Sequence, residues 1–189
     1  RAEEAISGAL SPGEGRSERA EAAKKMLALS LGKAGWPQEE IETHLARGYQ
    51  SYWLSCDLEE QIEHARLIRE AEAKESALTV HHRIDKAHGF TEVTIYTDDH
   101  PGLFSQIAGA MALSGASIVD AKIVTLANGM ALDSFGVQDS EGGALDAPER
   151  LKKLESNLER ALTGRVRLAK ELAARRGSLP ARARAFRVP

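Results

Sequence analysis

An eight-residue stretch, TDDHPGLF at residues 97–104, gathers polar and turn-forming groups where an alternating apolar pattern changes to a helical one. Pro101 suits the first position of a helix, which needs no amide hydrogen. The amides of Gly102 and Leu103 would then point out of a helix N-terminus, where the dipole favours an anion such as a carboxylate. Glycine at 102 lets a ligand approach the backbone, and alanine there should obstruct the ligand while leaving the helix intact.

Acidic side chains precede this turn. Asp98 or Asp99 could receive an ammonium group, so a free amino acid, anionic at one end and cationic at the other, fits the stretch. The alternative is that Asp99 only caps the helix. Asp98, Asp99 and His100 are adjacent, with no further metal ligand supplied locally, and Ser105 has no base that the sequence places beside it. We therefore predict no catalytic and no metal-binding residues.

A second polar cluster, HHRID at residues 81–85, invites a metal-site interpretation. On a strand, His81 and His82 point to opposite faces, and the cationic Arg83 would lie among the ligands. The pattern is more typical of a polar strand surface.

The elements that must position these groups fall into three segments. Residues 1–15 are rich in Gly, Ser and Pro, which predicts a disordered lead-in. Residues 16–76 show helical periodicity and are predicted to form a helical segment. Residues 77–189 are predicted to form an α+β domain with its core at 90–164, followed by a basic helical extension and the start of a linker.

Three helices are expected in the helical segment. The first starts at Ser17 and stops at Gly32 or Gly35, and the second has Pro37 at its first position. The third begins with a capping box of Asp57 and Glu60 and runs to about residue 74.

The following domain reads as strand, helix, strand, strand, helix. TEVTIYT (91–97) alternates as a strand does, a helix then stops at Gly115, and two β-like runs (117–126 and 130–139) flank Asn128-Gly129, a strong hairpin signal. A second helix has its capping box at Asp146 and Glu149, stops at Gly164, and is followed by a basic helical stretch at 165–176. ARAFRVP (183–189) is the candidate last strand of an antiparallel ferredoxin-like βαββαβ sheet with helices on one face.

The bulk composition narrows the class of protein. A chain of 189 residues with 42% hydrophobic content can bury a core, and the absence of a leader or a long apolar run favours a cytoplasmic protein without a membrane partner. The only cysteine, Cys56, cannot form an internal disulfide. The chain starts with Arg1, so we expect a piece of a longer protein. Residues 147–189 carry 12 Lys or Arg and 4 Asp or Glu. Apart from Phe186 these basic residues lack interleaved aromatics, so a solvated helix face and linker are favoured over a nucleic-acid partner.

Two stretches resemble a known family. The run from TEVTIYTDDHPGLF to MALDSFGVQDSEG (91–142) resembles an ACT domain, the small βαββαβ effector-binding module marked by an acidic-x-x-Gly-Leu turn. GYQSYWLSCDLEEQIEHARLI (48–68) is similar to the helical region that precedes the first ACT domain in bacterial bifunctional uridylyltransferase/uridylyl-removing enzymes. The resemblance covers about residues 16–189.

That resemblance implies a regulatory fragment without catalysis of its own. In the family, separate domains uridylylate the PII signalling protein and remove the uridylyl group, magnesium is expected for the whole enzyme, and paired ACT domains sense glutamine. The resemblance implies no cofactor for this fragment, and a second ACT domain or another copy as partner through the sheet edge. The effector site carries over to the turn and to the next strand, at Asp98, Asp99, His100, Gly102, Leu103, Ser117 and Ile118.

Two alternatives remain open. The chain could be an assembly module without a ligand of its own, or the ACT domain of another regulated enzyme, such as an alarmone synthetase/hydrolase. The uridylyl-removing family explains residues 48–68 better.

Overall fold

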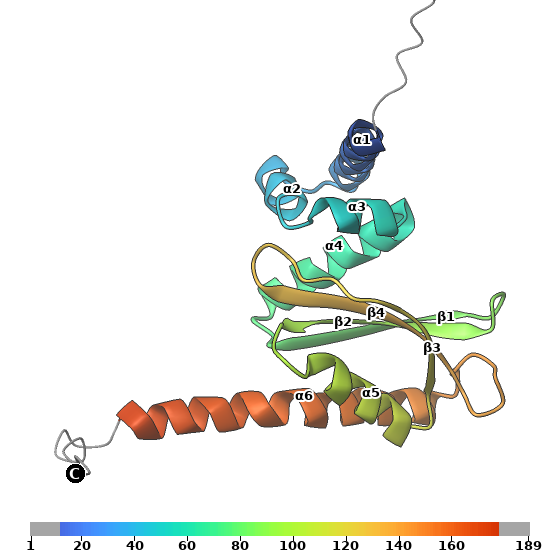
Figure 1. Cartoon of the computed structure of the whole chain (residues 1–189), viewed down its shortest axis with the longest axis vertical. Helices are drawn as coiled ribbons and strands as arrows, with labels where there is room; N and C mark the ends of the chain where they lie inside the picture. Colours follow the sequence, from blue (N-terminus) through green and yellow to red (C-terminus); the bar gives the residue numbers. More distant parts are fainter. Residues whose placement is uncertain (1–11, 178–189) are drawn as a thin grey trace, which may run out of the picture. The chain divides into compact units, whose positions relative to one another are not determined.

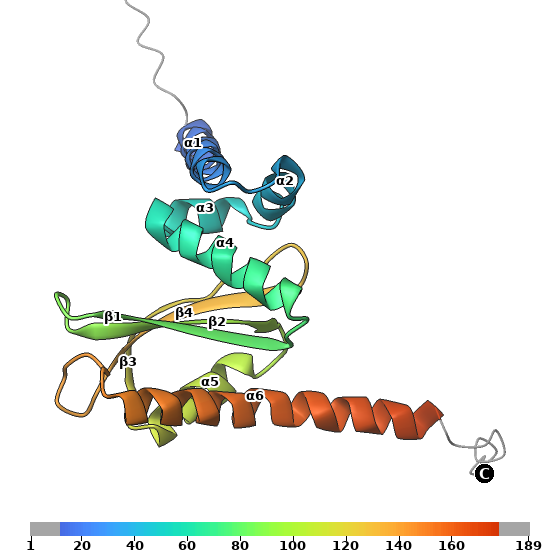
Figure 2. The ribbon, with the colours of Figure 1, turned by 180° about the vertical axis from the view of Figure 1, so that it is seen from behind.

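A computed structural model of the chain describes the backbone of residues 12–177 and the side chains of residues 13–164. The elements are labelled in Figure 1 and seen from behind in Figure 2. In chain order they are α1 (Pro12–Lys33), α2 (Gln38–Leu45), α3 (Gln50–Ser55), α4 (Leu58–Ala73), β1 (Leu78–Asp85), β2 (Phe90–Asp98), α5 (Leu103–Leu113), β3 (Ser117–Lys122), β4 (Met130–Gln138) and α6 (Pro148–Gly177).

The predicted α+β class is confirmed, with a helical region followed by an antiparallel sheet in the order β1-β2-β4-β3. The succession β2, α5, β3, β4, α6 is the expected strand, helix, strand, strand, helix. The place beside β2, which a last strand of a ferredoxin-like sheet would take, is held by β1. The predicted strand at 183–189 lies outside the described residues.

Contacts between residues divide the chain into two compact units. Within the described residues, unit 1 is 12–81, Thr94–Asp99 and Ala121–Ser134, and unit 2 is His82–Val93, His100–Asp120 and 135–177. In unit 1, parts of β2 and of the β3–β4 region group with the helices.

The first helix starts earlier than predicted. α1 begins at Pro12, inside the predicted lead-in, and passes through Ser17. A proline at the first helical position and Glu14 in the first turn explain the earlier start, since both suit a helix N-terminus. The predicted stop is confirmed at Gly35, whose left-handed φ of 80° follows the end of the helix at Lys33.

The other helices of unit 1 include one that the sequence did not reveal. Pro37 is the N-cap of α2 and lies one position before its first residue. The capping box of α4 is confirmed: the amide of Glu60 donates to Asp57 Oδ1, and the amide of Asp57 donates to Glu60 Oε2, both at 2.9 Å. The missed helix, α3, has only six residues, too few for a periodic pattern to stand out.

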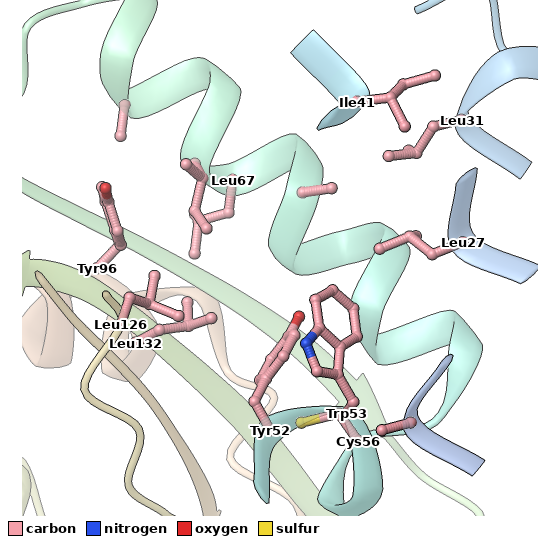
Figure 3. Packing of buried hydrophobic residues seen from close by; sticks show 14 residues of the cluster. Leu27, Leu31, Ile41, Tyr52, Trp53, Cys56, Leu67, Tyr96, Leu126 and Leu132 are labelled. Carbon is pink, nitrogen blue, oxygen red and sulfur yellow. The ribbon is translucent and has the colours of Figure 1, made fainter. Parts of the chain in front are cut away.

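The core of unit 1 joins helices to the strand segments within that unit. In Figure 3, Leu67 of α4 points toward Tyr96, Leu126 and Leu132, which belong to the same buried cluster. α1 and α2 add buried side chains, while α3 places Tyr52 and Trp53 edge to face, with ring centroids 4.8 Å apart. Burial on this scale is what stabilises helices too short to persist alone.

Unit 2 is built around α5 and α6. Their buried faces include Ile107 and Met111 from α5 and Leu154 and Leu158 from α6, together with Phe135 of β4. One face of α6 is thus buried against this core.

The predicted end of the last helix is wrong, however. α6 starts at Pro148 with Asp146 outside it, and it runs through Gly164 to Gly177 as one helix of 30 residues. A single glycine inside a helix costs about 1 kcal/mol relative to alanine, which long flanking helical segments can offset.

Candidate functional site

Two acidic residues of the predicted effector site lie in unit 1. Asp98 is the exposed last residue of β2. Asp99 is held by the hairpin that follows β3: its Oδ2 accepts from Thr125 Oγ1 at 2.6 Å, and its amide donates to the Gly129 carbonyl at 3.3 Å. Asp99 therefore does not cap α5, and its carboxylate is oriented by a threonine.

The turn that opens α5 lies in unit 2 and differs from the predicted geometry. Gly102 is the N-cap, with φ 88° and ψ 1°, so Pro101 stands before the helix and is not its first residue. The Leu103 amide donates to the His100 carbonyl at 3.1 Å and is not free for a ligand. The prediction that alanine at 102 would leave folding intact is also wrong, because left-handed backbone strains any residue with a Cβ.

One of the two backbone amides that were predicted to bind an anion remains available in the turn. Among the described residues, no acceptor is found for the Gly102 amide, and this glycine is exposed. A Cβ built on Gly102 would meet nothing within 4 Å, so the space over this backbone is open. The turn can thus offer one exposed backbone donor where two were predicted.

The remaining predicted residues, His100, Ser117 and Ile118, also belong to unit 2. His100 is half-buried, with Nδ1 3.1 Å from the Pro101 carbonyl oxygen. Ser117 is exposed and Ile118 half-buried at the start of β3. Within the described part of unit 2, no hydrogen bond joins these two residues to the His100–Leu103 turn.

A buried carboxylate was missed. Asp133 on β4 is 2% exposed, and its Oδ1 accepts from the Val124 amide at 3.1 Å. Burial raises the pKa of the Asp133 carboxyl to about 6; the Val124 hydrogen bond opposes this shift, and the negative charge of Asp99 adds to it. The signal in the sequence was an acidic residue inside the otherwise apolar run MALDSFGV. Perturbed carboxylates of this kind concentrate at functional sites.

A chain of buried polar groups also went unpredicted. Tyr52 Oη lies 3.2 Å from His64 Nδ1, His64 Nε2 lies 3.3 Å from Ser134 Oγ, and that hydroxyl lies 3.2 Å from Thr94 Oγ1. Burial lowers the pKa of His64 to about 4, so the imidazole is neutral at pH 7 and acts as both donor and acceptor. The chain links α3 and α4 to the strand segments of unit 1.

The polar strand β1 carries ordinary surface pairs. In unit 2, His82 Nδ1 lies 3.1 Å from Glu155 Oε1, and Arg83 pairs with Glu92 at 2.6 Å. Across the described residues, no three His, Cys, Asp or Glu side chains gather as a metal site. No helix in the same part of the chain has the length and apolar character needed to cross a membrane.

The fold and the turn together define a class: an α+β module that follows a helical segment and presents a glycine turn between a strand and a helix. Curated relatives narrow this class. The chain is 45% identical over 190 residues to a bifunctional uridylyltransferase/uridylyl-removing enzyme of Azospirillum brasilense, an alignment that covers 100% of the chain and 20% of the relative. Relatives of the same name from Gluconobacter oxydans and Rhodospirillum rubrum are 47% and 43% identical over 81% and 93% of the chain, and 16% and 19% of their own lengths.

The chain belongs to the family of bifunctional uridylyltransferase/uridylyl-removing enzymes. It spans about one fifth of the length of the relatives it matches. No model of a protein family matches the chain, and no solved structure matches it.

Proposed function

We propose that this chain is the regulatory, effector-binding region of a cytoplasmic uridylyltransferase/uridylyl-removing enzyme that modifies the PII nitrogen-signalling protein. The observation that carries the proposal is the likeness to enzymes of that name along the whole chain, which forms only a small part of each relative. In this proposal the transferase and hydrolase chemistry belongs to parts of the enzyme that the chain does not span.

Magnesium, which uridylyl transfer would use, belongs to those other parts as well. The described side chains, those of residues 13–164, offer no cluster of three acidic, His or Cys groups for it. The described residues therefore do not fit a metal site.

The effector in this proposal is glutamine, bound by an ACT-type module. Two features support an amino-acid ligand: the exposed Gly102 amide suits a carboxylate, and the Asp98 and Asp99 carboxylates suit an ammonium group. Ser117 and Ile118 are proposed to complete the site in the assembled protein.

Glutamine titration by calorimetry on the 189-residue chain tests this. Asp99→Asn should weaken binding about tenfold, the loss expected for one charge-assisted contact. Asp120→Asn, an exposed residue of β3 outside the predicted site, is the matched control and should bind as the parent does. An Asp99→Asn variant that binds glutamine with unchanged affinity would remove this residue from the effector site, and a parent chain that shows no heat of binding would refute the proposal for this region by itself.

A second candidate function, assembly through the sheet, is favoured by β3. This strand is at one edge of the sheet, most of its residues are exposed, and Val119 is 52% exposed. Unblunted edges pair with partner strands, so a second module or another copy would add to this edge.

Sedimentation measures that assembly. The parent should associate at micromolar concentration, and Val119→Lys should shift it toward monomer because charge on an edge strand opposes pairing. A parent that sediments as a monomer would contradict edge pairing between copies of this chain.

A further inference from the structure

A pocket in unit 1 has no role in the function proposed above. It has a volume of about 530 Å³ and is lined by the end of the α1–α2 connection, α2, and α4. This volume lies in the range of small-molecule sites. Trp36, His44, Arg47 and Arg69 are among its lining residues.

His44 is the unusual member of this lining. It is 4% exposed, and within the described part of the chain neither ring nitrogen has a hydrogen-bond partner. Burial, followed by the charge of Arg47, lowers the pKa of His44 to about 4, so the ring is neutral at pH 7, with one N–H donor and one acceptor nitrogen. A buried polar group without a partner costs about 1 to 3 kcal/mol, and a bound molecule in the pocket would recover part of that cost.

The charges around His44 come in both signs. Arg47 pairs with Glu72 at 2.7 Å, and Arg69 pairs with Glu40 at 3.1 Å. Each guanidinium has five N–H donors and uses few of them in these pairs. Arg69 also lies over the Trp36 ring, 4.4 Å from its centroid, which fixes its position.

Glu39 adds a carboxylate that has no ion pair among the described residues. The lining thus holds three carboxylates and two guanidiniums. An ion with only a negative charge would be repelled by the carboxylates, and an ion with only a positive charge would be repelled by the guanidiniums. A molecule with both charges can place its cationic group at Glu39 and its anionic group at the unused donors of Arg47 or Arg69.

We propose that this pocket binds a small zwitterion, with Glu39 receiving the cationic group, Arg47 or Arg69 the anionic group, and the His44 ring forming a hydrogen bond to the bound molecule. This site is distinct from the turn at Gly102 and does not depend on glutamine binding there.

The His44 ring signals in an NMR spectrum of the 189-residue chain report on the pocket directly, and the spectrum of His44→Phe assigns them. Glycine, L-alanine and L-serine are the zwitterionic probes, and acetate and methylammonium carry the single charges. Millimolar zwitterion should shift the His44 signals with saturation, while either single ion at the same concentration should leave them in place.

Glu39→Gln tests the cationic subsite. This exposed residue of α2 should be replaceable without loss of fold, and its change should weaken zwitterion binding about tenfold. Glu42→Gln, on the same helix but outside the pocket, is the matched control and should bind as the parent does. The proposal is overturned if acetate or methylammonium shifts the His44 signals as much as a zwitterion does, or if Glu39→Gln binds the zwitterion with full affinity. It is also overturned if no zwitterion shifts the signals, which would mean that water alone fills the pocket.

Discussion

At the scale of single residues, Asp133 shows how a fold perturbs one carboxyl group. It lies on β4 beside the hairpin that also holds Asp99, and its ordinary pKa of 3.8 is raised to about 6. The folded state therefore binds a proton that the unfolded chain releases between these two values. The contribution of Asp133 to the free energy of unfolding is most favourable below pH 3.8, and it is lost as the pH rises through 6.

Asp133→Asn should remove this dependence. The asparagine Oδ1 can still accept from the Val124 amide, so at pH 7.5 the variant should be more stable than the parent by about 1 to 3 kcal/mol. At pH 4 the two should converge. Urea unfolding at both pH values measures the difference, and an equal gap at each pH would show that Asp133 is not the group that titrates.

Gly102 gives a second prediction at this scale. Alanine at a left-handed position should lower the free energy of unfolding by about 1 kcal/mol. Gly109→Ala, inside α5 with open space at its Cβ, should raise it by up to about 1 kcal/mol. Thermal unfolding of both variants checks the pair; a stable Gly102→Ala would mean that the turn relaxes to another conformation.

The residues of the effector turn were accessible from sequence, but their geometry was not. TDDHPGLF located the glycine turn between a strand and a helix correctly. Its helix was predicted to start at Pro101, because a proline suits a first helical position; the left-handed Gly102 instead places the start at Leu103. His44 and Asp133 were missed because burial, which gives each its unusual character, depends on distant segments of the chain.

At the scale of elements, α3 depends on one close backbone approach. A Cβ built on Gly48 would lie 2.6 Å from Tyr52 Cδ1 and 2.7 Å from Trp53 Cε2. The Gly48 carbonyl also accepts from Trp53 Nε1 at 2.8 Å. Position 48, two residues before α3 begins, is therefore restricted to glycine by the two aromatic rings packed on it.

Gly48→Ala should destabilise the protein by about 1 to 3 kcal/mol, the usual cost of overpacking. Near-UV circular dichroism should change as well, because Tyr52 and Trp53 must move. Gly32→Ala, a position of α1 with open space around its Cβ, serves as the control and should be neutral or stabilising. Wild-type stability in Gly48→Ala would show that the rings are loosely held.

The helices and strands themselves were largely predictable. Capping at Asp57, the stop at Gly35 and the turn at Gly129 rest on local chemistry, and each is found in the structure. α3 and the continuation of α6 through Gly164 were not predicted, since the first is too short for periodicity and the second overrides a weak local signal. Capping and turn preferences of the local sequence therefore determine where an element begins and ends only where tertiary packing does not oppose them.

At the scale of the whole molecule, unit 1 does not end where the helical pattern ends. Leu67 of α4 belongs to the same buried cluster as Tyr96, Leu126 and Leu132, which follow later in the chain. A chain cut after residue 76 would expose the α4 side of this cluster, at a cost of about 2 kcal/mol for each large apolar side chain.

A chain of residues 1–76 should therefore lack a cooperative unfolding transition, whereas the 189-residue chain should show one. Circular dichroism during thermal unfolding distinguishes the two. A cooperative transition in the short chain, with the midpoint of the full one, would show that the helical segment folds without the later strands and would contradict this prediction.

The interleaving of unit 1 along the chain also sets an order for folding during synthesis. The ribosome completes α1 through α4 first, but the segments Thr94–Asp99 and Ala121–Ser134 that share their core are made later. Until then the apolar side of α4 stays uncovered and open to chaperones or to aggregation. The contacts that finally cover it close long loops, which slows folding relative to a bundle with only local contacts.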